Sequence, residues 1–170
     1  MRKIEFTYAQ LYGDRRYYIS EEDVKIVLSR LPQEIYLQLR AVHFDDRSRG
    51  VRTLGYTTKR GRREITICAL PPRVSLSRFL VAGQSAGTFG AKIGQQWSQT
   101  AVRRFLLYDV LLHEIGHLQI IKPSNSSFRL KFAGETKAQE FADFWRKQLW
   151  KERFEHKDLV HNAPTVEELV

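Results

Sequence analysis

The feature that most constrains this chain is a pair of histidines four residues apart inside its most apolar stretch. Residues 113–117 read H-E-I-G-H, and apolar residues recur with helical spacing around them from Val102 to Leu118. In a helix, residues four apart lie on one face, so both imidazoles can present a ring nitrogen to one ion. Because buried histidine and glutamate are costly without a partner, the pattern predicts a metal site on a helix over residues 98–120. A pair of satisfied core histidines is the alternative.

Glu114 follows the first histidine of this pattern. It lies about 100° round the helix from His113, so it can stand beside a bound ion without ligating it. A carboxylate in that place is within reach of a water molecule on the ion. Glu114 is therefore the candidate general base.

A third metal ligand is expected from the last long helix, which we expect to begin near Glu135. Zinc in a catalytic site takes three protein ligands and keeps one position open. Glu135, Ala138 and Gln139 share one face of that helix. We expect Glu135 to be the third ligand and Gln139 to hydrogen-bond a ligand ring. Glu140 is an alternative third ligand.

The preceding half of the chain favours an α+β fold. Ser20 and the acidic residues after it open a helix that Pro32 ends. Residues 3–8 could form a first strand, and three further runs with β character cover residues 39–44, 53–58 and 64–70, the last two as a hairpin. We expect a small antiparallel sheet of three strands packed on the helices. Residues 71–98 contain four glycines and form either a mobile loop or a flap over a site.

Length and composition set the domain organisation. The 170 residues fit one domain, which we place at residues 1–156, followed by a polar, flexible tail at 157–170. The one cysteine, Cys68, excludes an intramolecular disulfide and a thiolate metal cluster. No apolar run approaches the roughly 18–20 residues that span a bilayer, and no signal peptide is visible, so we expect a cytoplasmic protein without membrane contact.

The charge of the chain is strongly positive. Lys and Arg total 28 against 19 Asp and Glu, a net charge of +9. Many of the cations crowd the region from Arg40 to Arg63. This region is either a solvated hairpin or a docking surface for nucleic acid or an acidic protein.

The H-E-x-x-H segment, followed by E-x-x-A-x-x-F-A at residues 135–142, resembles the ImmA/IrrE-type zinc metallopeptidases. These are minimal gluzincins, related in architecture to SprT-like proteases. The resemblance covers about residues 20–150. It implies one zinc ion bound by His113, His117 and Glu135, with Glu114 as the catalytic base. It also implies hydrolysis of peptide bonds in a protein or peptide substrate.

The same resemblance implies a substrate lying along an edge strand and a side chain that stabilises the oxyanion. The candidate edge strand is residues 64–70. Arg129, Tyr108 and His161 are candidates for the oxyanion role. Two rival interpretations are a catalytically silent module of the same fold, which binds through the basic region, and a zinc-free structural domain. An intact Glu114 favours the enzyme, because a scaffold needs no base beside the metal.

Overall fold

The computed structural model describes residues 3–46, 52–58, 63–120 and 128–170. The strands are β1 (Glu5–Tyr8), β2 (Ala41–Asp45), β3 (Gly55–Thr58) and β4 (Glu64–Cys68). The helices are α1 (Glu21–Ser29), α2 (Gln33–Tyr36), α3 (Gln99–Phe105), α4 (Leu111–Leu118), α5 (Phe128–Trp150) and α6 (Val166–Leu169). None of the helices in the described ranges is both long enough and apolar enough to span a lipid bilayer.

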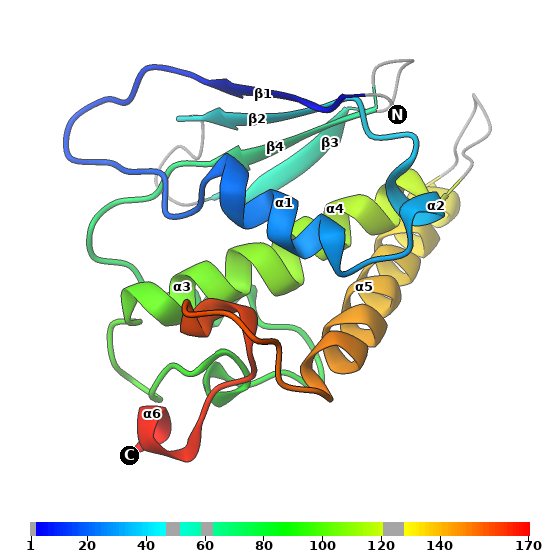
Figure 1. Cartoon of the computed structure of the whole chain (residues 1–170). Helices are drawn as coiled ribbons and strands as arrows, with labels where there is room; N and C mark the ends of the chain where they lie inside the picture. Colours follow the sequence, from blue (N-terminus) through cyan, green and yellow to red (C-terminus); the bar gives the residue numbers. More distant parts are fainter. Residues whose placement is uncertain (1–2, 47–51, 59–62, 121–127) are drawn as a thin grey trace.

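The four strands form one mixed sheet in the order β1-β2-β4-β3. β1, β2 and β4 run parallel, and β3 pairs antiparallel with β4. The α+β class and the antiparallel pairing of the last two strands are confirmed, but the expected antiparallel sheet of three strands is wrong. In the sequence, α1 connects β1 to β2. It carries the chain back to the end of the sheet at which β1 began, so β2 runs parallel to β1 (Figure 1).

β4 is an interior strand. It pairs with β2 on one side and with β3 on the other, so the expectation that residues 64–70 form the edge strand is wrong. Among the described strands the edges of the sheet are β1 and β3, and β3 is the edge beside β4. A Cβ atom on Gly55 would lie 2.9 Å from both the carbonyl oxygen of Thr66 and Cγ1 of Val110, so β3 and the central helix are closely packed at that point.

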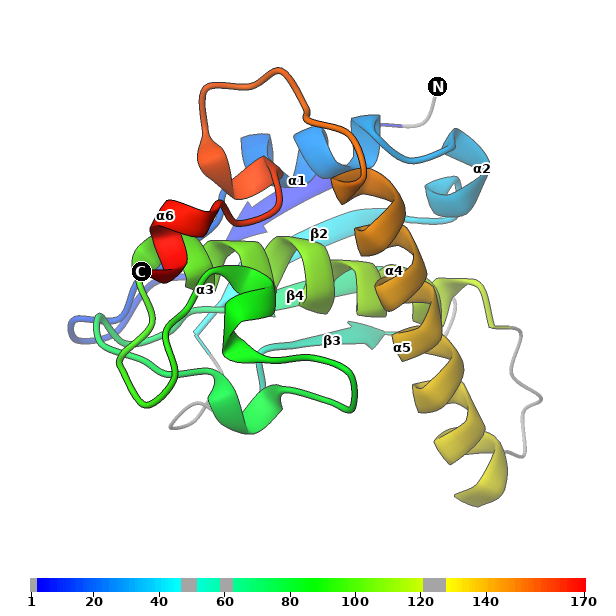
Figure 2. The same cartoon turned by 90° about the horizontal axis from the view of Figure 1, so that it is seen from below.

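The helix expected at residues 98–120 is present as α3, a π-helical turn η3 (Leu106–Val110) and α4, joined end to end. Ser98 caps it by accepting a hydrogen bond from the backbone N–H of Ala101. Its apolar residues are almost completely shielded from solvent, among them Leu106, Leu107, Leu111 and Leu112. The helices lie on one face of the sheet, and α5 crosses α4 (Figures 1 and 2).

α5 begins earlier than expected. It starts at Phe128, so Glu135 lies within the helix and not at its beginning. Gly134, just before Glu135, suggested a break, yet the helix continues through it. The carboxylate of Glu135 is therefore presented by continuous helical backbone on both sides.

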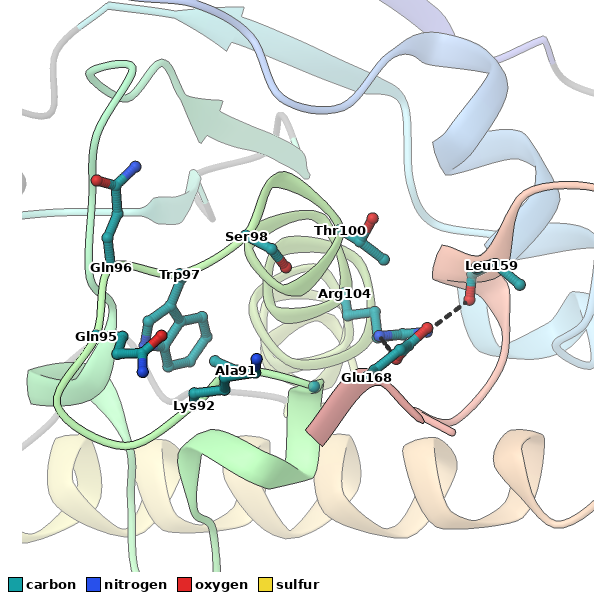
Figure 3. A pocket seen from close by; sticks show the side chains of 11 residues that line it. Ala91, Lys92, Gln95, Gln96, Trp97, Ser98, Thr100, Arg104, Leu159 and Glu168 are labelled. Carbon is teal, nitrogen blue, oxygen red and sulfur yellow. Dashed lines mark hydrogen bonds and ion pairs between the residues drawn. The ribbon is translucent and has the colours of Figure 1, made fainter. Parts of the chain in front are cut away.

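The C-terminal segment, expected as a flexible tail, is packed against the domain. Val160 and His161 are fully buried. Arg104, which is only 1% exposed, forms an ion pair with Glu168 of α6 at 2.6 Å and donates to the carbonyl oxygen of Leu159 (Figure 3). A buried guanidinium needs such partners, and the tail supplies them, so the domain extends beyond residue 156.

Candidate metal site

Three side chains from α4 and α5 converge at the crossing of these helices. Nε2 of His113 lies 3.1 Å from Nε2 of His117. Glu135 reaches both rings, with one carboxylate oxygen 3.2 Å from His113 Nε2 and the other 3.0 Å from His117 Nε2. This cluster could hold a metal ion. Among the described residues Glu140 is not part of it.

The spacing of the three groups fits a small tetrahedral ion. Zinc bonds to imidazole and carboxylate of about 2.0–2.2 Å place neighbouring ligand atoms about 3.3 Å apart. The spacings of 3.0–3.2 Å between the ring nitrogens and the carboxylate oxygens are close to that value. The side chain of Glu135 is 54% exposed, against 7% for His117, so the cluster is open to solvent on one side.

A glycine allows the two helices to approach. A Cβ atom on Gly116 would lie 2.9 Å from the carbonyl oxygen of Ala138 and 3.0 Å from its Cα. Any larger residue at Gly116 would push α5 away from α4. Because Glu135 lies one turn before Ala138 on α5, this close contact also sets the distance between Glu135 and His117.

Gln139 lies behind His113, as expected for a partner of a ligand ring. Its Oε1 is 2.9 Å from Nδ1 of His113. An amide oxygen only accepts, so Nδ1 of His113 carries the proton and Nε2 keeps its lone pair. That tautomer presents a metal-binding nitrogen toward Glu135.

Glu114 is 6% exposed and lines a cavity of about 260 Å³ together with His113 and Glu135. The hydroxyl of Thr57, on the edge strand β3, contacts a carboxylate oxygen of Glu114 and lies 3.2 Å from its backbone carbonyl oxygen. The edge strand β3 therefore holds the candidate general base, Glu114, beside the three candidate metal ligands.

Several residues of the site escaped sequence reasoning. Asp109, on the π-helical turn, accepts hydrogen bonds from Gln139, Arg146 and Gln84. Burial is the main cause that raises the pKa of Asp109, although these donors act in the opposite direction. The sequence signal that could have pointed to Asp109 is an acid on one largely apolar helix face and an arginine, Arg146, on another. Arg52 lines the cavity beside Glu114, whereas the sequence had placed it only in the basic region from Arg40 to Arg63.

The oxyanion candidates lie elsewhere. Tyr108 and His161 are completely buried, and the tyrosine hydroxyl is 2.8 Å from Nδ1 of the histidine. Burial raises the pKa of Tyr108 to about 12, and Arg30 donates to its hydroxyl. Neither residue lines the described cavities beside His113. Nothing is described for the side chain of Arg129, and five of the eight cations between Arg40 and Arg63 lie outside the described residues.

Comparison with known proteins does not identify a family for this chain. No family model matches it, and neither a curated protein nor a solved structure matches it.

Proposed function

We propose that this chain is a zinc-dependent metallopeptidase. The observation that carries the proposal is the convergence of two imidazoles and one carboxylate, with the buried Glu114 lining the same cavity. The similarity of the two motifs to those of ImmA/IrrE-type zinc metallopeptidases supports it.

The donor set favours zinc over other common ions. Two imidazoles and one carboxylate form the usual ligand set of hydrolytic zinc sites, whereas calcium and magnesium take mainly oxygen ligands. When bound, the ion supplies Lewis acidity, which lowers the pKa of water to about 7 and polarises a carbonyl group.

The residues of the chain perform the proton transfers. Glu114 accepts a proton from the attacking water and passes it to the leaving amine as the peptide bond breaks. Thr57 fixes the carboxylate of Glu114 from the neighbouring strand. Gln139 keeps His113 in the tautomer that binds the ion.

The surroundings of the cluster suit an extended polypeptide. β3 is the sheet edge at the cavity, and a substrate strand can pair with the side of β3 on which no other described strand lies. A second cavity of about 600 Å³, lined by Val81 and Ala82 together with Glu135, receives a side chain of the substrate. Arg52 lines the first cavity and places a cation where negative charge develops on the cleaved carbonyl.

The proposal is tested with the full chain and its Glu114→Gln variant. Elemental analysis after zinc loading should give one zinc per chain in both proteins. A proteome-derived peptide library, read by mass spectrometry, should show cleavage by the wild type. The variant should cleave at least about 100-fold more slowly, because the general base is lost without loss of volume. Absence of zinc uptake, or equal cleavage by the variant, would refute the proposal.

A further inference from the structure

Next to His113 and Gln139 lies a pair of acids, the buried Asp109 and the half-buried Asp143, which we call the carboxylate pair. The same three side chains, Gln84, Gln139 and Arg146, donate to one oxygen of each acid. Their distances to Asp109 Oδ1 are 2.8, 3.0 and 3.0 Å, and those to Asp143 Oδ1 are 3.2, 3.1 and 2.9 Å. Asp109 and Arg146 are 5% and 3% exposed, whereas Asp143, Gln84 and Gln139 are half-buried, so the network is buried at its Asp109 end and reaches solvent at the other.

The carboxylate pair determines which way the Gln139 amide points. The Nε2 amide group of Gln139 donates to an oxygen of each acid, at 3.0 and 3.1 Å, so this end of the amide faces the carboxylate pair. Its Oε1 is then left for His113. The carboxylate pair thus sets the tautomer of a candidate metal ligand through the Gln139 amide.

Gln84 connects the turn at residues 81–84 to this network of hydrogen bonds. Its backbone N–H donates to the carbonyl oxygen of Val81 at 3.0 Å, closing a turn in which Gly83 has a φ of +85°. Its Oε1 accepts from the backbone N–H of Val81 at 3.1 Å, while its Nε2 donates to the carboxylate pair. One side chain therefore joins the turn to the network behind His113.

We propose that Gln84 is a positioning residue of the metal site, and that it couples the turn at residues 81–84 to metal binding. This inference rests on the metal-binding part of the proposed function and not on hydrolysis. Without Gln84, each acid of the carboxylate pair loses one of three donors, and Gln139 and Arg146 must redistribute to satisfy them. The amide that orients His113 is then held less firmly.

The coupling acts in both directions. Val81 and Ala82 line the cavity that His113 and Glu135 also line, so the turn and the candidate ligands share one wall. If the turn strengthens metal binding, metal binding must stabilise the turn by the same factor. Zinc is therefore expected to slow hydrogen exchange at the Val81 amide.

The test compares Gln84→Ala with the matched variant Gln96→Ala, whose side chain is exposed on the same segment of the chain. Zinc affinity is measured by competition with a chromophoric chelator, after circular dichroism has shown equal folding. Loss of an outer-shell partner weakens metal binding by about 10–100-fold, and we expect the lower end for Gln84→Ala and no change for Gln96→Ala. The d–d absorption spectrum of bound Co²⁺ should shift only in Gln84→Ala. A second variant, Gln84→Glu, adds a third acid to the network and should lose more affinity.

Equal zinc affinity and equal Co²⁺ spectra in the wild type and Gln84→Ala would overturn the inference. So would zinc protection of the Val81 amide that persists unchanged in that variant. If the wild type binds no zinc, this inference and the proposed function both fall. If it binds zinc but cleaves no peptide, only the hydrolytic proposal falls, because none of these measurements requires activity.

Discussion

The close contact between α4 and α5 can be tested by adding one methyl group, with Gly116→Ala. The new Cβ would lie 2.9 Å from the carbonyl oxygen of Ala138, 3.0 Å from its Cα and 3.2 Å from Cβ of Phe141. Favourable contacts between carbon atoms lie at about 3.5–4.0 Å. None of these three atoms can move away by a change of rotamer, so the helices must separate by about half an ångström.

The magnitude follows from two opposing effects. Overpacking a well-packed contact costs about 1–3 kcal/mol, whereas alanine gains about 1 kcal/mol over glycine from helix propensity. Because the obstructing atoms belong mainly to backbone, we expect the upper part of the range, a net loss of about 1–2 kcal/mol. For a chain of this size that lowers the melting temperature by about 2–8 °C. Metal–ligand distances tolerate only about 0.2 Å, so zinc affinity should also fall.

The assay is thermal and urea denaturation with the metal removed, followed by zinc titration. Gly87→Ala is the matched control, because its Cβ would meet nothing closer than 3.7 Å. The control should be at least as stable as the wild type and bind zinc equally. A Gly116→Ala protein as stable as the control, with unchanged zinc affinity, would refute the argument that this glycine sets the spacing of the ligands.

Two further predictions concern stability away from the site. Glu168→Gln should lower the free energy of unfolding by about 2–3 kcal/mol, which is less than the full cost of breaking a buried ion pair because the side chain of Glu168 is 21% exposed. The matched variant Glu167→Gln, at an exposed residue of the same helix, should have little effect. Equal losses of stability in urea denaturation would contradict the role of the ion pair with Arg104. Burial acts to raise the pKa of Asp23, but His161, the Ser20 backbone N–H and the Arg103 guanidinium together outweigh it and lower the pKa to about 2, below its ordinary value of 3.8. The lowered pKa means that ionised Asp23 stabilises the folded state above about pH 4, and this stabilisation is lost as the pH falls toward 2. The free energy of unfolding should therefore fall less between pH 4 and pH 2 in Asp23→Asn than in the wild type, as measured by urea denaturation.

The helical features of this chain were predictable because they depend on local spacing. His113 and His117 face one another as soon as residues 98–120 form a helix, and Glu135 was found from residue types on one helix face. The sheet was harder, since strand order depends on pairings between segments far apart in the chain. No local sequence pattern shows whether β4 is paired on both sides or lies at an edge of the sheet. The start of α5 was misplaced because Gly134 suggested a break, and the helix continues through it.

The network behind the ligands was out of reach for a related reason. Gln84 is a polar residue in a glycine-containing loop, and only the folded chain brings it within 2.8 Å of Asp109. Asp109 lies four residues before His113, yet no short motif includes it. Its role in the site depends on hydrogen bonds from Gln139 and Arg146, which lie on α5 and contact Asp109 only in the folded chain.

The charge distribution of the site argues for a bound cation, although the chain as a whole is positively charged. The chain has a net charge of +9. The described charged groups that line the two cavities or bond to their walls are nevertheless mostly acidic: Asp109, Glu114, Glu135, Glu140 and Asp143 against Arg52 and Arg146. Five carboxylates and two guanidiniums leave a formal charge of −3, which a divalent ion reduces to −1. Two of the carboxylates, Asp109 and Glu114, are buried, where like charges repel strongly. A bound dication removes most of that repulsion, so the same residues that could ligate the metal also make the empty site electrostatically unfavourable.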